Sequence, residues 1–254
     1  MSLPKPPSFD LSGKSALVTG AGRGIGLAAA VVLAQHGADV TLAARTRDEI
    51  EAGAAEIRAA GGKAQALVLD VTDIAATKAT LEAGPAYDIL VNNAGTNRPG
   101  PFTEVSLDAY DVVMNLNVRA AFFVAQTVAA RMLAEKKAGS IIHMSSQMGH
   151  VGGANRTLYC ASKWAIEGLS KAMAVELGPH NIRSNTLCPT FIETQMTRPY
   201  LTEPTFRASV IAKIKLGRLG QVDDLTGPLL LLASDAGGLM TGASLLVDGG
   251  WTAG

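Results

Sequence analysis

Residues 19–26 read TGAGRGIG and lie between an apolar run at 15–19 (SALVT) and a helical pattern at 25–36. A glycine-rich turn between a first strand and a first helix is where a doubly wound sheet offers backbone N–H groups to a phosphate. Glycine accepts positive φ, and without a Cβ it lets the backbone approach the phosphates closely. The spacing differs from the GxGxxG form. The stretch predicts a dinucleotide site made by Gly20, Arg23, Gly24, Ile25 and Gly26.

Short apolar runs alternate with helical patterns outward from this turn. Strands are expected at 15–19, 38–43, 64–69, 89–91, 140–144, 182–187 and 244–247. Helices are expected at 25–36, 46–60, 107–136, 158–177 and 222–233. Apolar strands separated by helices pair in parallel and are buried on both faces. The sequence therefore predicts a single α/β domain over residues 1–254, with a Rossmann fold whose doubly wound, seven-stranded parallel sheet carries helices on both faces.

The segment 189–219 shows no clear periodicity. Irregular segments of this length in compact domains usually serve function, so we expect a substrate-binding loop here. The alternative is a pair of helices with a weak sequence pattern.

The composition is that of a globular protein with a large core. Of the 254 residues 48% are hydrophobic and 17% are charged, which excludes a disordered chain. Lys plus Arg and Asp plus Glu each number 22, so no net positive charge is available for nucleic acid or anionic lipid. No apolar run reaches the roughly 18 residues of a membrane span, and prolines near the start replace the apolar core of a secretory signal. We expect neither a nucleic-acid nor a membrane partner.

Cysteine and histidine are sparse. Cys160 and Cys188 cannot form a disulfide framework and fit a reducing cytoplasm. The four histidines lack metal-binding spacing, so no metal site is expected.

The end of the second predicted strand bears on the type of dinucleotide. Sites that prefer NAD place an acid there to accept a hydrogen bond from the ribose 2′-hydroxyl, but residues 42–45 read LAAR. Arg45 and Arg23 would bind a 2′-phosphate through charge-assisted hydrogen bonds, so NADP is expected and NAD is less favoured. The alternative is two solvated surface arginines. We interpret Asp48 and Glu49 as helix-start residues, Glu49 in a capping box with Thr46.

A tyrosine and a lysine are spaced for proton transfer. Tyr159 and Lys163 are four residues apart in YCASK, which places both side chains on one face of a helix. A nearby cation can lower the pKa of a phenol from about 10 by about 1–3 units, toward the range of a general acid or base. Ser146 lies thirteen residues upstream, after the fifth predicted strand. If the tyrosine and lysine are considered without the rest of the sequence, the alternative is a tyrosine packed in the core beside an exposed lysine.

Taken together, these motifs resemble the classical short-chain dehydrogenase/reductase family from about residue 11 to residue 251. The pieces that carry the resemblance are TGAGRGIG at 19–26, Asp70, NNAG at 92–95, Asn117, the Ser146 to Tyr159 spacing, YCASK at 159–163 and VDGG at 247–250.

The resemblance implies an enzyme that interconverts a ketone and a secondary alcohol by hydride transfer to or from a nicotinamide. Tyr159 would exchange the proton, Lys163 would hold the nicotinamide ribose and Ser146 would hydrogen-bond the substrate oxygen. Asn117 would bind a water that leads protons from Lys163 to solvent, with Asn115 as the competing candidate.

The resemblance also implies further cofactor contacts. Asp70 and Val71 would hold the adenine, and Asn93, Ala94 and Gly95 would line the adenosine side. Pro189, Ile192 and Thr194 would lie near the nicotinamide carboxamide. The family places a Pro-Gly pair after the sixth strand, where this chain has Pro189-Thr190, and this departure puts the local backbone shape in doubt.

The substrate is least defined. Arg98, His150, Arg156 and Arg198 are candidates for the pocket mouth, where they would favour a polar or carboxylate-bearing substrate; the alternative is that these arginines face solvent. Residues 193–206 are similar to family members acting on gluconate and related keto-sugar acids, so a keto-sugar acid, sugar or polyol is expected. Two alternatives stay open, a 3-oxoacyl-thioester (acyl-carrier-protein) reductase and a non-catalytic dinucleotide sensor. The resemblance also implies a homotetramer.

Overall fold

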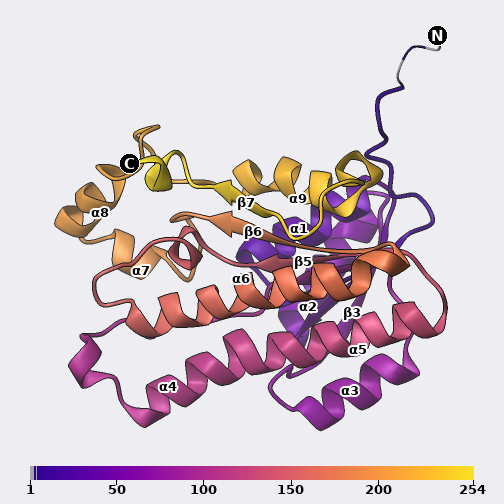
Figure 1. The fold of residues 1–254 in the computed structure, drawn as a ribbon, viewed down its shortest axis with the longest axis horizontal. Coiled ribbons are helices and arrows are strands. Elements are labelled where there is room, and N and C mark those ends of the chain that lie inside the picture. The colour runs from indigo at the N-terminus through magenta and orange to yellow at the C-terminus, as the bar shows by residue number, and fades with distance from the viewer. Residues whose placement is uncertain (1–2, 4) are drawn as a thin grey trace.

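The expected alternation of strands and helices is confirmed in the computed structural model, which describes residue 3 and residues 5–254 (Figure 1). Residues 1, 2 and 4, which belong to the expected single domain, lie outside the described residues. The strands are β1 (Ser15–Thr19), β2 (Asp39–Ala44), β3 (Lys63–Val68), β4 (Ile89–Asn92), β5 (Gly139–Met144), β6 (Ile182–Pro189) and β7 (Ser244–Val247). They form a seven-stranded sheet in the order β3-β2-β1-β4-β5-β6-β7, in which every pair is parallel.

The order reverses between β1 and β4, which places the ends of these two strands at the topological switch point of the sheet. In a doubly wound fold a ligand binds in the crevice outside the carboxyl ends of the strands at this point. The turns after β1 and β4 hold the glycine-rich stretch and NNAG, so the two motifs meet there.

Helices cover both faces of the sheet (Figure 1). They are α1 (Gly24–Gln35), α2 (Arg47–Ala59), α3 (Ile74–Ala83), α4 (Leu107–Met114), α5 (Ala121–Ala134), α6 (Thr157–Leu177), α7 (Arg198–Leu201), α8 (Pro204–Ile211) and α9 (Thr226–Ala233). One apolar core packs α1, α2 and α9 against one sheet face, and a second packs α3, α5 and α6 against the other. The continuous apolar character of the strands follows from this double burial.

Three helical features differ from the sequence-based expectation. The helix α3 was not predicted, because only Thr77 and Leu81 of its ten residues are buried and it lacks an apolar stripe. The helix expected at 107–136 is interrupted by a π-helical stretch, Asn115–Ala120, between α4 and α5. The segment 189–219 contains α7 and α8, so the alternative of a helix pair is confirmed for part of it.

The continuous helical span Leu107–Ala134 is long and apolar enough to cross a membrane by length and composition, with a mean hydropathy of 1.3 over its most apolar window. Half of that window is buried inside the protein. Core helices of water-soluble proteins pass the same test, so this is weak evidence for a membrane span.

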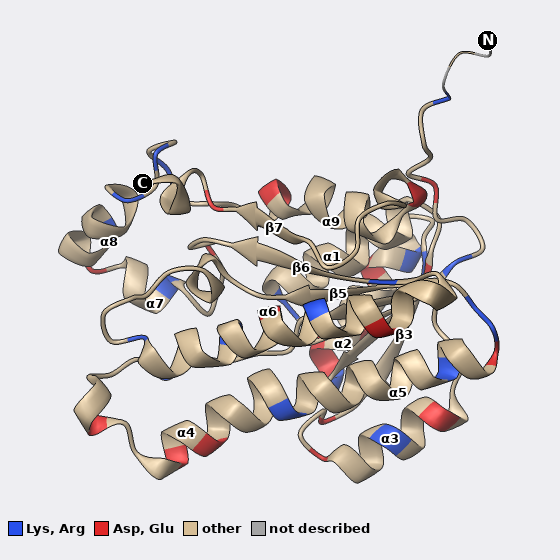
Figure 2. Ribbon diagram, in the orientation of Figure 1, with Lys and Arg blue, Asp and Glu red and all other residues tan. Residues whose placement is uncertain are grey.

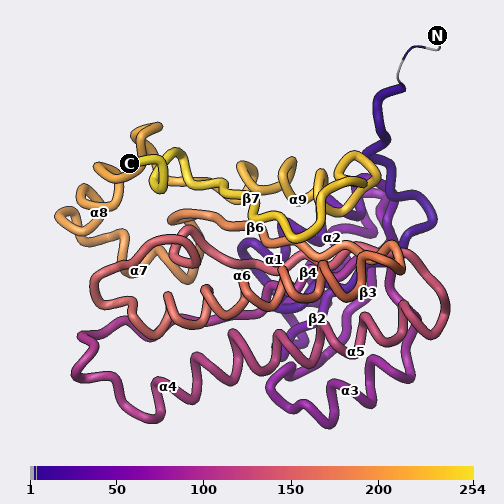
Figure 3. The backbone as a smooth tube through the Cα atoms, in the orientation of Figure 1, coloured from indigo at the N-terminus to yellow at the C-terminus, as the bar shows by residue number. Residues whose placement is uncertain are grey.

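The last residues of the chain return to the segment that follows β6 (Figure 3). Trp251 stacks on Phe191 with ring centroids 5.7 Å apart, and the ring of Phe206 meets Phe191 edge-on. These rings pack against a small apolar cluster made by Leu201, Val210, Ile214 and Leu219. This third cluster holds α7 and α8 over the carboxyl end of the sheet.

Acidic and basic residues are distributed over many elements (Figure 2). Several form ion pairs with a residue four positions later in the chain, such as Lys78 with Glu82 on α3 and Arg131 with Glu135 at the end of α5. This distribution accords with a net charge of zero.

Candidate active site

A cleft of about 320 Å³ lies at the carboxyl end of the sheet. Most of the residues predicted from the sequence to bind cofactor or to act on substrate line it. These are Gly20, Arg23, Gly24, Ile25, Gly26, Arg45, Asp70, Val71, Asn93, Ala94, Gly95, Ser146, Tyr159, Lys163, Pro189, Ile192 and Thr194. Side chains and loops from both halves of the chain therefore meet around one space.

Two positions of the glycine turn require glycine, Gly26 for lack of space and Gly20 for its backbone conformation. A Cβ on Gly26 would lie 2.3 Å from the carbonyl oxygen of Gly20, and Gly20 itself has a φ of +64°. The amide of Asn93 fixes the turn, since its Nδ2 donates to the carbonyl oxygens of Thr19 at 2.9 Å and Gly20 at 3.2 Å. The NNAG motif thus holds the turn in the shape that leaves the N-terminus of α1 open to the cleft.

The far end of the cleft carries mixed charge. Arg45 is exposed, and its positive charge contributes to lowering the pKa of Asp70. Burial raises the pKa of Asp70, but hydrogen bonds from Thr72 and the charge of Arg45 outweigh that effect. This end of the cleft, which the sequence predicts to hold the adenosine, therefore combines an ionised carboxylate with an exposed guanidinium.

Glu49 departs from the sequence-based expectation. The predicted capping box is wrong, because Thr46 makes no side-chain cap at the start of α2. Instead, Oε1 of Glu49 lies 3.2 Å from Nη1 of Arg23, and Glu49 lines the cleft. This tertiary ion pair replaces the local cap and leaves Arg45 as the cleft arginine without an ion-pair partner among the described residues.

Tyr159 and Ser146 lie together at the inner end of the cleft. Burial raises the pKa of Tyr159 to about 12, against a smaller opposite effect from the hydrogen bond with Ser146. The expectation that a neighbouring cation lowers the pKa of Tyr159 below 10 is therefore wrong for this arrangement, in which burial is the larger effect. The hydroxyl of Ser146 also donates to Gln147 at 2.8 Å and accepts from the amide of Met148 at 3.1 Å, which fixes its position.

Lys163 lies one helical turn after Tyr159 on α6, with its Nζ 5.4 Å from the centre of the phenol ring. The side chain is buried, and its ammonium donates to the carbonyl oxygen of Met144 at 2.8 Å. Burial lowers the pKa of Lys163 to about 8, so most molecules carry the charge at neutral pH. A buried ammonium that is held in this way keeps a cation beside the phenol.

Asn117 lies in the π-helical stretch between α4 and α5 and is buried, whereas its competitor Asn115 is exposed. Its Oδ1 accepts from the amide of Thr96 at 2.8 Å, and its Nδ2 donates to the carbonyl oxygen of Thr96 at 2.9 Å and to Ser162 at 3.1 Å. Ser162 in turn donates to the carbonyl oxygen of Tyr159 at 2.7 Å. π-Helical turns occur often at functional sites, and this one joins the loop after β4 to α6.

The replacement of the family's glycine by Thr190 causes no backbone strain. Thr190 is not among the described non-glycine residues with positive φ, and its amide continues the sheet by donating to Val247 at 3.2 Å. Its hydroxyl oxygen is buried at the cleft and has no protein hydrogen-bond partner. This unpaired oxygen, together with the open glycine turn, fits a cleft that accepts a polar dinucleotide.

Of the residues predicted to meet the substrate, Ser146 lines the cleft, but none of the four candidates for the pocket mouth belongs to the lining. Arg156 lies beside it, since its charge acts on Tyr159 and its guanidinium lies 5.9 Å above the ring of Tyr200. Nε2 of His150 lies 3.5 Å from Glu167 of α6, outside the cleft. Arg98 and Arg198 are exposed and do not line the cleft, in agreement with the alternative that they face solvent.

Sequence reasoning did not single out several cleft residues. Thr96 lines the cleft from the loop after β4, and Gln195, Met196 and Thr197 line it from within the segment 189–219 that was expected to bind substrate. Only their position next to NNAG and Pro189 could have indicated them, because loop residues carry no periodic signal.

Comparisons with known proteins identify the family of this chain. A family model described as Enoyl-(Acyl carrier protein) reductase matches residues 20–252. The chain belongs to the classical short-chain dehydrogenase/reductase family. It is 41% identical to D-erythrulose reductase from Gallus gallus and 38% identical to L-xylulose reductase from Mus musculus, each over 96% of this chain and 98% of the relative.

A solved member of the short-chain dehydrogenase/reductase family shows the same fold with ligands bound. The gluconate 5-dehydrogenase from Burkholderia cenocepacia J2315, in complex with NADP and tartrate, superimposes with a TM-score of 0.93 at 35% identity, covering 97% of this chain and 98% of that chain. Short-chain dehydrogenase/reductase relatives thus include proteins named for erythrulose, xylulose and gluconate, all small polar molecules.

Proposed function

We propose that this protein is an NADP(H)-dependent oxidoreductase that interconverts a ketone and a secondary alcohol on a small polar substrate such as a keto-sugar acid, sugar or polyol. The observation that carries the proposal is the meeting of Ser146, Tyr159 and Lys163 with the open glycine turn in one cleft. The relatives named for sugars and sugar acids support the substrate class.

In this proposal the protein places two hydrogen-bond donors where charge develops. The chemistry that NADPH supplies when bound is delivery of a hydride to the carbonyl carbon. As negative charge grows on the carbonyl oxygen, Ser146 and Tyr159 donate to it, and Tyr159 gives up its proton to form the alcohol. The high pKa of Tyr159 keeps the phenol protonated before reduction.

The proton lost by Tyr159 must be replaced from solvent before the next turnover. Lys163 lies beside the phenol with an ammonium that can lose a proton near pH 8. Asn117 and Lys163 approach each other at Gly95. A Cβ on Gly95 would lie 3.3 Å from the Oδ1 of Asn117 and 3.8 Å from the Nζ of Lys163. We assign to Lys163 and Asn117 the path that returns the proton.

The preference for NADP rests on Arg45. Arg45 lines the cleft at the end of β2 with no carboxylate paired to it, and the 2′-phosphate is a dianion that a guanidinium binds through two parallel hydrogen bonds. Arg23 is drawn toward Glu49, so it contributes less than Arg45. The gluconate 5-dehydrogenase with bound NADP supports this assignment.

The direct test is NADPH oxidation by the purified protein with a panel of ketones. The panel contains 5-ketogluconate, erythrulose and xylulose as polar ketones and acetoacetyl thioester as a 3-oxoacyl substrate. We expect the highest kcat/KM among the polar ketones. Preference for the thioester would instead support a 3-oxoacyl reductase, and tight NADPH binding without oxidation in any reaction would support the sensor.

We also propose that the protein forms a homotetramer in the cytoplasm. Helices α5 and α6 expose large apolar side chains, with Phe122 exposed to 42%, Trp164 to 55% and Val175 to 79%. Burial of such side chains between subunits would stabilise an oligomer. Light scattering after size-exclusion chromatography should give about four times the mass of one chain; the mass of one chain would refute the tetramer.

A further inference from the structure

A buried carboxylate lies below the proposed active site on the same helix face. Tyr159, Lys163 and Glu167 follow one another at four-residue spacing on α6, so their side chains lie along one face. Glu167 is 5% exposed, and no role in the mechanism above requires it. A buried charge that serves neither cofactor nor substrate directly needs another explanation.

Neutral groups hold the carboxylate of Glu167. Its Oε2 accepts from the hydroxyls of Thr186 at 2.9 Å and Ser244 at 2.5 Å, and its Oε1 accepts from the thiol of Cys188 at 3.3 Å. Burial raises the pKa of Glu167, but hydrogen bonding by Ser145 and by these three groups lowers it below its ordinary value, so the group is ionised at neutral pH. These donors stabilise the charge without cancelling it.

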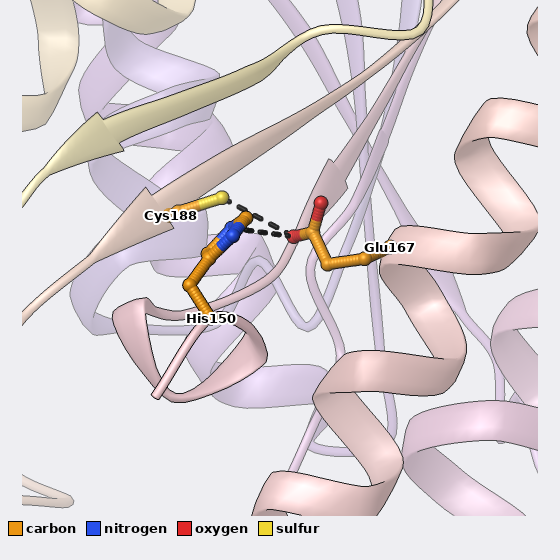
Figure 4. Close-up of side chains that lie close together, drawn as sticks. All are labelled: His150, Glu167 and Cys188. Atoms are coloured by element: carbon orange, nitrogen blue, oxygen red, sulfur yellow. Dashed lines mark hydrogen bonds and ion pairs between the residues drawn. The ribbon is translucent and has the colours of Figure 1, made fainter. Parts of the chain in front are cut away.

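The titratable groups that face Glu167 come from four elements. They are Lys163 on α6, His143 on β5, Cys188 on β6 and His150 just after the turn Gln147–Gly149. Figure 4 shows the side chains of His150, from a loop, and Cys188, from a strand, pointing toward the carboxylate of Glu167. Burial lowers the pKa of His143 to about 4 and, with Glu167, raises that of Cys188 to about 12, so both are neutral at pH 7.

His150 lies 3.5 Å from the carboxylate, but Lys163 is the facing group that lies beside the phenol of Tyr159, so its charge matters most for the reaction. Its burial favours the neutral amine, and Cys188 and Glu167 are the two groups that oppose that effect. Of these two, Glu167 is the one that is ionised at neutral pH, because the pKa of Cys188 is raised to about 12. The hydrogen bond of Lys163 to Met144 fixes the position of its Nζ but supplies no net charge.

We infer that Glu167 is the buried counter-charge that keeps Lys163 protonated next to Tyr159, and that it is a positioning residue for the reaction. This inference rests on the proposed function, because it assumes that the charge of Lys163 serves the exchange of a proton at Tyr159. Without the carboxylate, Lys163 loses its proton at lower pH and the phenol loses its neighbouring cation.

The test compares the pH dependence of ketone reduction in Glu167→Gln with that of the parent. The rate falls at high pH as Lys163 loses its proton, since Tyr159 deprotonates only far above that range. We expect the midpoint of this fall in kcat/KM to lie about one pH unit lower in Glu167→Gln. Glu167→Asp, which keeps the charge, should return the midpoint toward that of the parent.

The matched control is Glu176→Gln, which removes a carboxylate from an exposed position on the same helix and should leave the midpoint unchanged. Circular dichroism and thermal melting establish that each variant is folded. If Glu167→Gln does not fold, Glu167→Met replaces it as an uncharged side chain of similar length.

A readout that needs no turnover separates this inference from the proposed function. The affinity for NADPH, measured between pH 6.5 and 9.5, should weaken as Lys163 loses its charge beside the anionic cofactor, and in Glu167→Gln it should weaken at lower pH. A parent that binds NADPH but reduces no ketone would refute the proposed function alone. An unchanged midpoint in folded Glu167→Gln, in rate and in affinity, would overturn the role of Glu167.

Discussion

Replacing Arg45 by Ala should weaken the binding of NADPH but not that of NADH. The side chain lies exposed at the end of the cleft, so its attraction to a 2′-phosphate is screened by water. Two unit charges 4 Å apart interact by about 1 kcal/mol in water, and a dianion doubles this to about 2 kcal/mol. We therefore expect Arg45→Ala to weaken NADPH binding about 30-fold and to leave NADH binding unchanged.

The assay is a fluorescence titration of both cofactors at fixed ionic strength. Arg47→Ala is the matched control, because Arg47 lies two residues away, does not line the cleft and is 3.8 Å from Glu51. Arg45→Asp should go further, since an acid at this position repels the phosphate and accepts from a free 2′-hydroxyl. Equal weakening of NADPH and NADH by Arg45→Ala, or no weakening of either, would refute the reasoning.

Three further changes test the scaffold of the site. Asp88→Asn should lower the free energy of unfolding by about 2–3 kcal/mol at pH 7; because hydrogen bonds from Ser15 and the ion pair with Lys137 lower the pKa of Asp88 despite its burial, this stability is present above about pH 4 and is lost as the pH falls through the lowered pKa, so the difference in melting temperature between parent and variant should shrink on acidification below pH 4. Gly26→Ala should abolish NADPH binding and lower the melting temperature, whereas Gly152→Ala, at an exposed position with open space around it, should melt at or slightly above the parent's temperature; equal melting of both variants would contradict the close packing of the glycine turn. Asn117→Ala should cost about 1–3 kcal/mol in thermal unfolding by leaving the backbone groups of Thr96 unpaired, and wild-type stability would contradict that contact.

The strands and the inner cleft could be predicted because their signals are local. Continuous apolar runs mark strands buried on both faces, and TGAGRGIG and YCASK each lie within one turn or one helix. Observed strand limits differ from the predicted ones by at most two residues.

What the sequence did not predict depends on contacts between distant segments. Glu49 had the local pattern of a capping residue, but Arg23, 26 residues away, pairs with it instead. The π-helical stretch at Asn117 is fixed by Thr96, 21 residues away. The raised pKa of Tyr159 follows from burial of its phenol in the folded protein, which the spacing to Lys163 does not reveal.

The central claim is that Tyr159 exchanges the proton at the substrate oxygen. The most direct measurement is the kcat of ketone reduction by Tyr159→Phe with saturating NADPH, alongside its NADPH affinity. Loss of the hydroxyl should lower kcat about 10²–10⁴-fold while the cofactor binds as in the parent. Turnover by Tyr159→Phe at the parent's rate would contradict the claim.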